Sequence, residues 1–194
     1  MNLRNGVGCF VVCGGLLVAG CSSESPDTPS PGGGGTPGGG TKGGGTAKAT
    51  GTTEDFGQFT MLMPSGWEVG ASSNLLALVG GPIVAARLLG PMSDEPRSTV
   101  VVNVYTPAPS DARAFAEERL EAMDETEPAL VDAKVAGRSA VKRTYSTNSG
   151  SRRTTTYYLV ENDQGYELVC DAPTAKFDST VSTFDAIMQS VKFK

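Results

Sequence analysis

The sequence contains no histidine. This absence removes the commonest general base and the commonest metal-binding side chain. It excludes a Ser-His-Asp triad, a Cys-His dyad and a zinc site with imidazole ligands. Because no other catalytic or cofactor motif is present, we expect a protein that is not an enzyme, with no cofactor and no metal.

Cysteine is almost as scarce, with residues only at positions 9, 13, 21 and 170. The first three lie in or at the end of an apolar N-terminal segment, so the rest of the chain holds Cys170 alone. An intramolecular disulfide in that part is therefore excluded. Since Cys170 ends the apolar run 166–170, we expect a small buried hydrophobic side chain there rather than a reactive thiol.

An excess of positive charge is also missing. The chain has 16 Lys and Arg against 21 Asp and Glu, a net charge of −5, and residues 1–20 carry only Arg4. A general nucleic-acid ligand is excluded, because its binding requires a basic surface that displaces phosphate counterions. Attraction of a polybasic segment to anionic lipid is excluded as well, because the chain carries a net negative charge.

The N-terminus has the layout of a signal peptide. A short basic start is followed by uncharged, largely apolar residues 6–19, a run shorter than the ~20 residues that span a bilayer. The run ends in Leu17-Val18-Ala19-Gly20-Cys21, which resembles a lipobox, the bacterial site of cysteine lipidation and cleavage. The resemblance implies a signal peptide at 1–20 and a lipid on Cys21. The alternative is an ordinary signal peptide cleaved nearby, with Cys21 free or removed.

Lipid on Cys21 would be the membrane anchor, since each buried methylene contributes ~0.8 kcal/mol. The predicted location is the cell envelope, either outside the cytoplasmic membrane or at the outer membrane. Residues 21–55 then form the predicted tether, since residues 22–55 hold 11 of the 25 glycines and few apolar residues. Gly40-Thr41-Lys42 lacks the Gly-Lys-Ser/Thr ending of a phosphate-binding loop.

Residues 56–194 have the patterns of one folded domain. Apolar and β-branched runs separated by Gly, Pro, Asn and Asp predict strands, and 83–89 is assigned to a strand although its pattern also suits a helix. Turns are predicted at 64–66, 148–150 and 162–165, and Trp67 is expected to close one end of the core. The strands are expected at 59–63, 83–89, 99–105, 130–136, 139–147, 154–160, 166–170 and 191–193, with a further apolar run at 75–79.

Two helices complete the domain. Ser110-Asp111 supplies a capping oxygen for the first, which ends before Pro128, and the second is expected at about 176–189. Apolar residues of each recur at helical spacing, so each is expected to pack on a sheet. The element order predicts an α+β fold in which two helices cover a mainly antiparallel sheet. The apolar positions are Ala112, Phe115, Ala116, Leu120 and Met123 in the first helix, and Phe177, Val181, Phe184, Ile187, Met188 and Val191 in or beside the second.

Three segments resemble PsbP/Mog1-like (DcrB/LpqN-like) domains. They are the opening strand with Pro64-Ser65-Gly66-Trp67, the strand entry at 135–140, and the close formed by 166–168 with Ser190-Val191-Lys192-Phe193. The resemblance covers about 56–194 and implies an α/β/α sandwich. It also implies an accessory or binding role, as in photosystem II extrinsic subunits and many bacterial lipoproteins, without assigning a functional residue.

The sequence leaves three hypotheses for function. The first is a membrane-tethered accessory module whose partner is an envelope protein or a small ligand. The second is a metal site or carboxylate-based hydrolase built from the acidic residues of the first helix, for which a solvated acidic face is the favoured interpretation. The third is a structural envelope component guided by a basic hairpin, whose charges are more simply explained as protection against strand pairing. The acidic residues are Glu117, Glu118, Glu121, Asp124, Glu125 and Glu127, and the basic ones are Arg138, Lys142, Arg143, Arg152 and Arg153.

Overall fold

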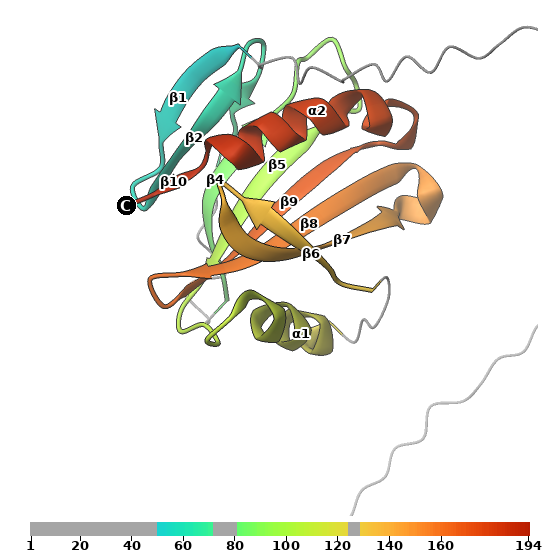
Figure 1. Cartoon of the computed structure of the whole chain (residues 1–194). Coiled ribbons are helices and arrows are strands. Elements are labelled where there is room, and N and C mark those ends of the chain that lie inside the picture. Colours follow the sequence, from blue (N-terminus) through green and yellow to red (C-terminus); the bar gives the residue numbers. More distant parts are fainter. Residues whose placement is uncertain (1–49, 72–80, 124–128) are drawn as a thin grey trace, which may run out of the picture. The chain divides into compact units, whose positions relative to one another are not determined.

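The computed structural model describes residues 50–71, 81–123 and 129–194. These residues form a large sheet, a small sheet and two α-helices (Figure 1). No helix in these three ranges is long and apolar enough to cross a membrane. The strands are β1 (Gly51–Asp55), β2 (Phe59–Pro64), β3 (Glu68–Val69), β4 (Ile83–Leu89), β5 (Thr99–Tyr105), β6 (Val131–Val135), β7 (Arg138–Thr147), β8 (Arg152–Glu161), β9 (Gln164–Pro173) and β10 (Lys192–Phe193), and the helices are α1 (Ala112–Ala122), α2 (Thr174–Ser190) and the short 3-10 turn η2 (Asn148–Gly150).

The large sheet has seven antiparallel strands in the order β3-β4-β5-β9-β8-β7-β6. Tight hairpins set much of its register. Ala136 and Gly137 join β6 to β7 with φ of 50° and 81°, and Asn162 and Asp163 join β8 to β9 with φ of 51° and 60°. Two successive residues with positive φ give the turn twist that matches paired strands. The turn at 148–150 likewise has three residues with positive φ and joins β7 to β8, so the hairpins predicted at 148–150 and 162–165 are confirmed.

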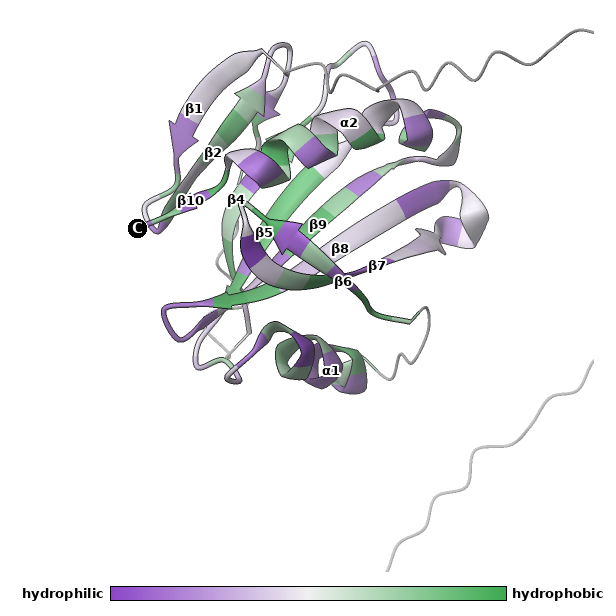
Figure 2. Ribbon diagram, viewed as in Figure 1, coloured by the Kyte–Doolittle hydropathy of each residue, from purple (hydrophilic) through white to green (hydrophobic). Residues whose placement is uncertain are grey.

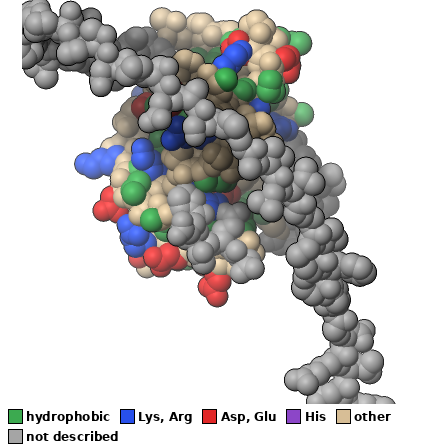
Figure 3. All heavy atoms as spheres, turned by 90° about the vertical axis from the view of Figure 1, so that its right-hand side faces the viewer, with side chains coloured by type: hydrophobic (Ala, Val, Ile, Leu, Met, Phe, Trp, Pro, Cys, Tyr) green, Lys and Arg blue, Asp and Glu red, His purple; other side chains and the backbone are tan. Residues whose placement is uncertain are grey.

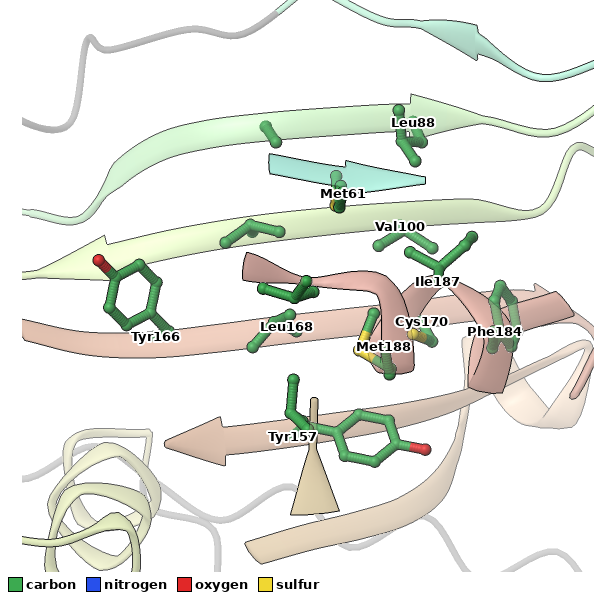
Figure 4. Packing of buried hydrophobic residues seen from close by; sticks show 14 of the residues in the cluster. Met61, Leu88, Val100, Tyr157, Tyr166, Leu168, Cys170, Phe184, Ile187 and Met188 are labelled. Atoms are coloured by element: carbon green, nitrogen blue, oxygen red, sulfur yellow. The ribbon is translucent and has the colours of Figure 1, made fainter. Parts of the chain in front are cut away.

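One face of the large sheet packs against α2 and the small sheet. The helix begins directly after β9 and packs on β2, β8 and β9, and its Phe184, Ile187 and Met188 are buried in the core cluster. Figure 2 shows hydrophobic residues along β5 and β9 beneath this helix, and Figure 4 shows their side chains meeting those of α2. Strand β2 adds Phe59 and Met61, which are 1% and 0% exposed. This face carries the main core.

The opposite face packs against α1. Asp111 caps this helix by accepting hydrogen bonds from the backbone N–H groups of Arg113 and Ala114, both at 2.9 Å. Phe115 and Ala116 are buried against Val141 of β7 and Tyr158 of β8. Helices on both faces of an antiparallel sheet make a sandwich of three layers, which confirms the predicted α+β class (Figure 1).

The structure departs from the predictions at residues 51–55 and at Met123, and it adds the short strand β3. Residues 51–55, which the sequence assigns to the tether, form β1 and pair with β2 from Gly51↔Pro64 to Asp55↔Thr60. Backbone pairing with β2 and an ion pair between Asp55 and Lys194 hold this strand, and its polar, mostly exposed side chains carry no core pattern. Met123, placed on the apolar stripe, is the C-cap of α1 and is 40% exposed. The apolar run 75–79 and Pro128 lie outside the described residues.

Candidate functional site

The lipidation site predicted from the sequence lies outside the described residues. These begin at Thr50, after Cys21 and most of the tether. Cys170, in contrast, is described and is fully buried beneath α2, between the sheet and Met188 (Figure 4). Burial, together with the carboxylates of Asp185 and Asp171, raises the pKa of its thiol. A buried thiol with a raised pKa is a hydrophobic packing group, as predicted.

The acidic face of α1 shows no metal-binding geometry in the part that the structure describes. Glu117, Glu118 and Glu121 are exposed on the helix. Asp124, Glu125 and Glu127 lie outside the described residues. Within 50–71, 81–123 and 129–194, no group of three acidic or cysteine side chains is placed to hold a metal ion. Figure 3 shows acidic and basic side chains interspersed on the lower part of the molecule, where α1 lies.

The basic hairpin does not protect a sheet edge, and that interpretation is wrong. Strand β8 lies between β7 and β9, and β6 pairs with β7 from Arg138 to Lys142. Of the basic residues only Arg143 lies in the stretch of β7 beyond β6, and it is buried. Charges on an interior strand have no free strand edge to protect. The position of β7 and β8 within the sheet depends on pairing with strands distant in sequence, so it cannot be predicted from the hairpin sequence alone.

The basic side chains are held within the domain. Arg138 lies 3.1 Å from Glu161, and Arg153 lies 3.5 Å from Asp178. Arg152 forms an ion pair with Asp171 and donates to the carbonyl oxygen of Arg97 at 2.9 Å. The positive charge of the hairpin is therefore largely neutralised locally, which weakens the case for a basic docking patch. Lys142 lies 5.6 Å from the ring centre of Tyr157.

A polar network on the α1 face of the sheet is the candidate site. At its centre is Glu167 of β9, which is only 8% exposed. One of its carboxylate oxygens accepts hydrogen bonds from the Asn103 side-chain amide at 2.9 Å and the Tyr105 hydroxyl at 3.0 Å. The strand register places Asn103, Glu167 and Tyr158 side by side on β5, β9 and β8. A buried carboxylate requires such partners, since water is excluded from it.

Arginine side chains extend the network on both sides. The Arg143 guanidinium, 2% exposed, lies 4.3 Å from the ring centre of Tyr145. Arg119 of α1 lies 4.4 Å from the ring centre of Tyr105 and so links the helix to the sheet. Planar guanidinium groups stack on aromatic rings in this way. The network therefore alternates cationic, aromatic and acidic groups across four strands and α1.

The titratable hydroxyls of this network stay protonated. Burial raises the pKa of Tyr158, with a further contribution from the Glu167 carboxylate, while the Arg143 guanidinium opposes the rise. Burial and Glu167 likewise raise the pKa of Tyr105, which Arg119 opposes. An activated nucleophile needs a lowered pKa or an adjacent base. The Tyr105 phenol instead donates a hydrogen bond to Glu167, so the network holds its strands and side chains in fixed positions.

Sequence reasoning missed Asn103, Tyr105 and Glu167 as a group. The residues lie on two strands, and Glu167 is more than 60 positions from its two partners. One signal was present, because Glu167 interrupts the apolar run 166–170 at a position where a strand buried on both sides requires an apolar residue or a paired polar one.

Comparison with known proteins supports the fold. No family model and no curated protein sequence matches the chain. Among solved structures, cyanobacterial PsbP (CyanoP) from Synechocystis sp. PCC 6803 superposes with a TM-score of 0.52 at 15% identity, covering 82% of this chain and all of that one. The protein therefore has a PsbP-like fold, as the resemblance of its motifs implied.

Two further structures resemble this one. A protein from Bacteroides thetaiotaomicron VPI-5482 matches with a TM-score of 0.51 at 11% identity, over 74% of this chain and 48% of its own, so this chain spans about half its length. LpqN, involved in cell envelope biogenesis of Mycobacterium tuberculosis, matches with a TM-score of 0.47 at 16% identity, over 70% of this chain and 83% of its own.

Proposed function

We propose that this protein is an exported, membrane-anchored lipoprotein whose domain acts as a non-catalytic binding or accessory module of the cell envelope. The observation that carries the proposal is the segment Leu17-Val18-Ala19-Gly20-Cys21, followed by a glycine-rich stretch and a domain of PsbP-like fold. A lipid anchor, a spacer and a small domain are the parts of a tethered module. We also propose that the domain is related to Mog1-like domains.

The chemistry of the domain supports a non-catalytic role. Where burial shifts the pKa of a tyrosine or cysteine in the described ranges, it raises the pKa, which keeps the group protonated. A protonated hydroxyl or thiol without an adjacent base is not an activated nucleophile. The polar network around Glu167 is buried, and its groups pair with one another, so it positions the sheet strands rather than reacting with a substrate. Within the described ranges, no group of side chains favours the alternative of an acidic metal site or hydrolase.

The anchor is tested by comparing two cysteine substitutions in the full chain. Cys21→Ala removes the lipid acceptor, whereas Cys13→Ala removes a cysteine eight positions earlier and is the matched control. With a radiolabelled or clickable fatty acid, we expect label and membrane association for the unsubstituted chain and for Cys13→Ala, and neither for Cys21→Ala. Equal labelling of all three chains, or none, would contradict lipidation at Cys21.

The accessory role is tested by crosslinking in cells followed by mass spectrometry. We expect the lipidated chain to recover one envelope protein that the Cys21→Ala chain does not recover. An empty result would direct the search to a small ligand. A calcium titration of the same protein tests the alternative, an acidic metal site. Calcium binding would release or absorb heat and would also shift the melting temperature, so both responses are required.

A further inference from the structure

The free edge of the large sheet has an unusual symmetry of sequence. Among the described residues, β6 pairs only with β7, so its other side is an open strand edge. The strand reads Val131-Asp132-Ala133-Lys134-Val135, which has apolar ends, opposite charges and a central alanine. The helices pack elsewhere, with α1 on β7 and β8 and α2 on β2, β8 and β9. Exposure confirms the open edge, since the Asp132 side chain is 91% exposed and Val131 is 51% exposed.

The hairpin decides which backbone groups point outward from this edge. A two-residue turn at Ala136 and Gly137 makes Val135 and Arg138 the hydrogen-bonded pair that closes the hairpin. Hydrogen-bonded and non-hydrogen-bonded positions alternate along an antiparallel pair. The backbone groups of Asp132 and Lys134 therefore point away from β7, toward solvent, where a further strand would pair.

Only one register suits two copies of this edge. Antiparallel pairing of identical edges can place Asp132 opposite Asp132, Lys134 opposite Lys134, or Asp132 opposite Lys134, because only these two residues present outward backbone groups. The first two registers set like charges directly opposite each other, which is destabilising. The third sets opposite charges together twice, with Ala133 facing its own copy on the two-fold axis.

We propose that β6 is a self-pairing edge through which two copies of this chain form a two-fold symmetric dimer with one continuous sheet. Isologous contact of this kind needs a self-complementary surface, and the strand is self-complementary in both charge and shape. On the α2 face, Val131, Ala133 and Val135 of each copy then form one apolar stripe. On the α1 face, Asp132 lies between Arg113, which is 2.8 Å away in the same copy, and Lys134 of the other.

The edge is short and carries lysine, a combination that also serves to prevent aggregation. The two readings differ in their consequences. An edge that only prevents aggregation does not require charges of opposite sign at Asp132 and Lys134, and it does not pair with a second copy. A dimer edge requires these opposite charges. The dimer does not require the lipid anchor, so its test and the test of Cys21 lipidation have separate outcomes.

Cysteine crosslinking of the full chain tests the register. In Ala133→Cys the new thiols face each other at a non-hydrogen-bonded pair, whose Cα atoms lie about 4.5 Å apart, within reach of a disulfide. Val131→Cys is the matched control, since it lies on the same strand face but pairs with Val135 of the partner copy. We expect a dimer band for Ala133→Cys at least about ten times stronger than for Val131→Cys or the unsubstituted chain, with or without Cys21→Ala. Equal bands, or a crosslink to another protein, would overturn the dimer.

Charge reversal tests the pairing itself, with Ala133→Cys in every chain. Asp132→Lys alone places Lys opposite Lys, and Lys134→Asp alone places Asp opposite Asp, so each is expected to lose about nine-tenths of the dimer band. Co-expression of the two, distinguished by tags of different size, makes every pair opposite and should restore a mixed dimer. If the single reversals leave the band unchanged, or co-expression fails to restore it, the proposed register is wrong. Unchanged melting temperatures establish that each variant folds, as expected for exposed positions.

Discussion

The two faces of the large sheet are packed by different chemistry, although the same strands supply both. On the α2 face, alternate residues of β5, β8 and β9 are apolar and meet an apolar helix face and a second sheet. On the α1 face, the intervening residues include Glu167 of β9, held by hydrogen bonds, and the neighbouring strand β7 adds Arg143, which stacks on Tyr145. The comparison teaches that an antiparallel strand can serve a hydrophobic core and a polar network at once, because its side chains alternate.

The difference between the faces also separates stability from specificity. Burial of apolar area contributes without regard to direction, so the α2 face holds the layers together. A buried polar network contributes little net energy, but each of its groups requires a partner at a fixed place. We therefore expect the α2 face to set the free energy of unfolding, and the α1 face to set the exact placement of the strands and of α1.

The largest effect is expected from removing a core side chain on the α2 face. Leu168→Ala deletes a side chain that is 1% exposed and should lower the free energy of unfolding by about 3 kcal/mol. Its neighbour Val169 lies on the other face and is only partly buried, so Val169→Ala should lower it by about 1 kcal/mol. Chemical denaturation measures both. Equal losses at 168 and 169 would contradict the division between the faces.

A smaller effect is expected from the centre of the polar network. Glu167→Ala leaves the Asn103 amide and the Tyr105 hydroxyl without their acceptor, which should cost about 2 kcal/mol. Glu167→Gln keeps one acceptor oxygen and should cost less. Glu118→Ala, on the exposed side of α1, is the control and should change stability by no more than about 0.5 kcal/mol. If Glu167→Gln proves as harmful as Glu167→Ala, the network depends on the charge and not on the acceptor.

The contact between α1 and the sheet gives the next test. A Cβ atom on Gly165 would lie 2.6 Å from the ring of Phe115, so Gly165→Ala must push the ring or the helix away. Overpacking of this size costs about 1 to 2 kcal/mol. In a Phe115→Leu background the same substitution should cost less, because the ring is absent. A double-mutant cycle by denaturation measures the coupling, and strict additivity would show that Gly165 does not limit the approach of α1.

The sequence predicts local features well and distant pairings poorly. Strand β5 at 99–105, the Asp111 cap and the turn at 162–165 follow from neighbouring residues, and all are confirmed. Strand β1 was missed because its stability comes from backbone pairing with β2, which leaves no apolar pattern.

The candidate site shows the same limit. Glu167 can be recognised as part of a network only when the strand register places it beside Asn103, and this register cannot be predicted from the sequence. The basic hairpin was misinterpreted for the same reason, since only the strand order shows that β6 pairs with the first half of β7 and that β8 is interior.

The smallest effect is expected in the small sheet, outside both faces. The Lys194 ammonium lies 2.6 Å and 2.8 Å from the two oxygens of Asp55, and with the Gly57 N–H it lowers the pKa of that carboxyl below its ordinary value of 3.8. A lowered folded-state pKa stabilises the fold above the ordinary value, and this contribution is lost as the pH falls through the folded-state pKa. Asp55→Asn should therefore lower the melting temperature slightly at neutral pH, and the difference should shrink below pH 3.8 and disappear below the folded-state pKa. Because the pair is exposed, added salt should reduce the difference at neutral pH. A difference that persists in acid would assign the role of Asp55 to the turn at Gly57 and not to the charge of Lys194.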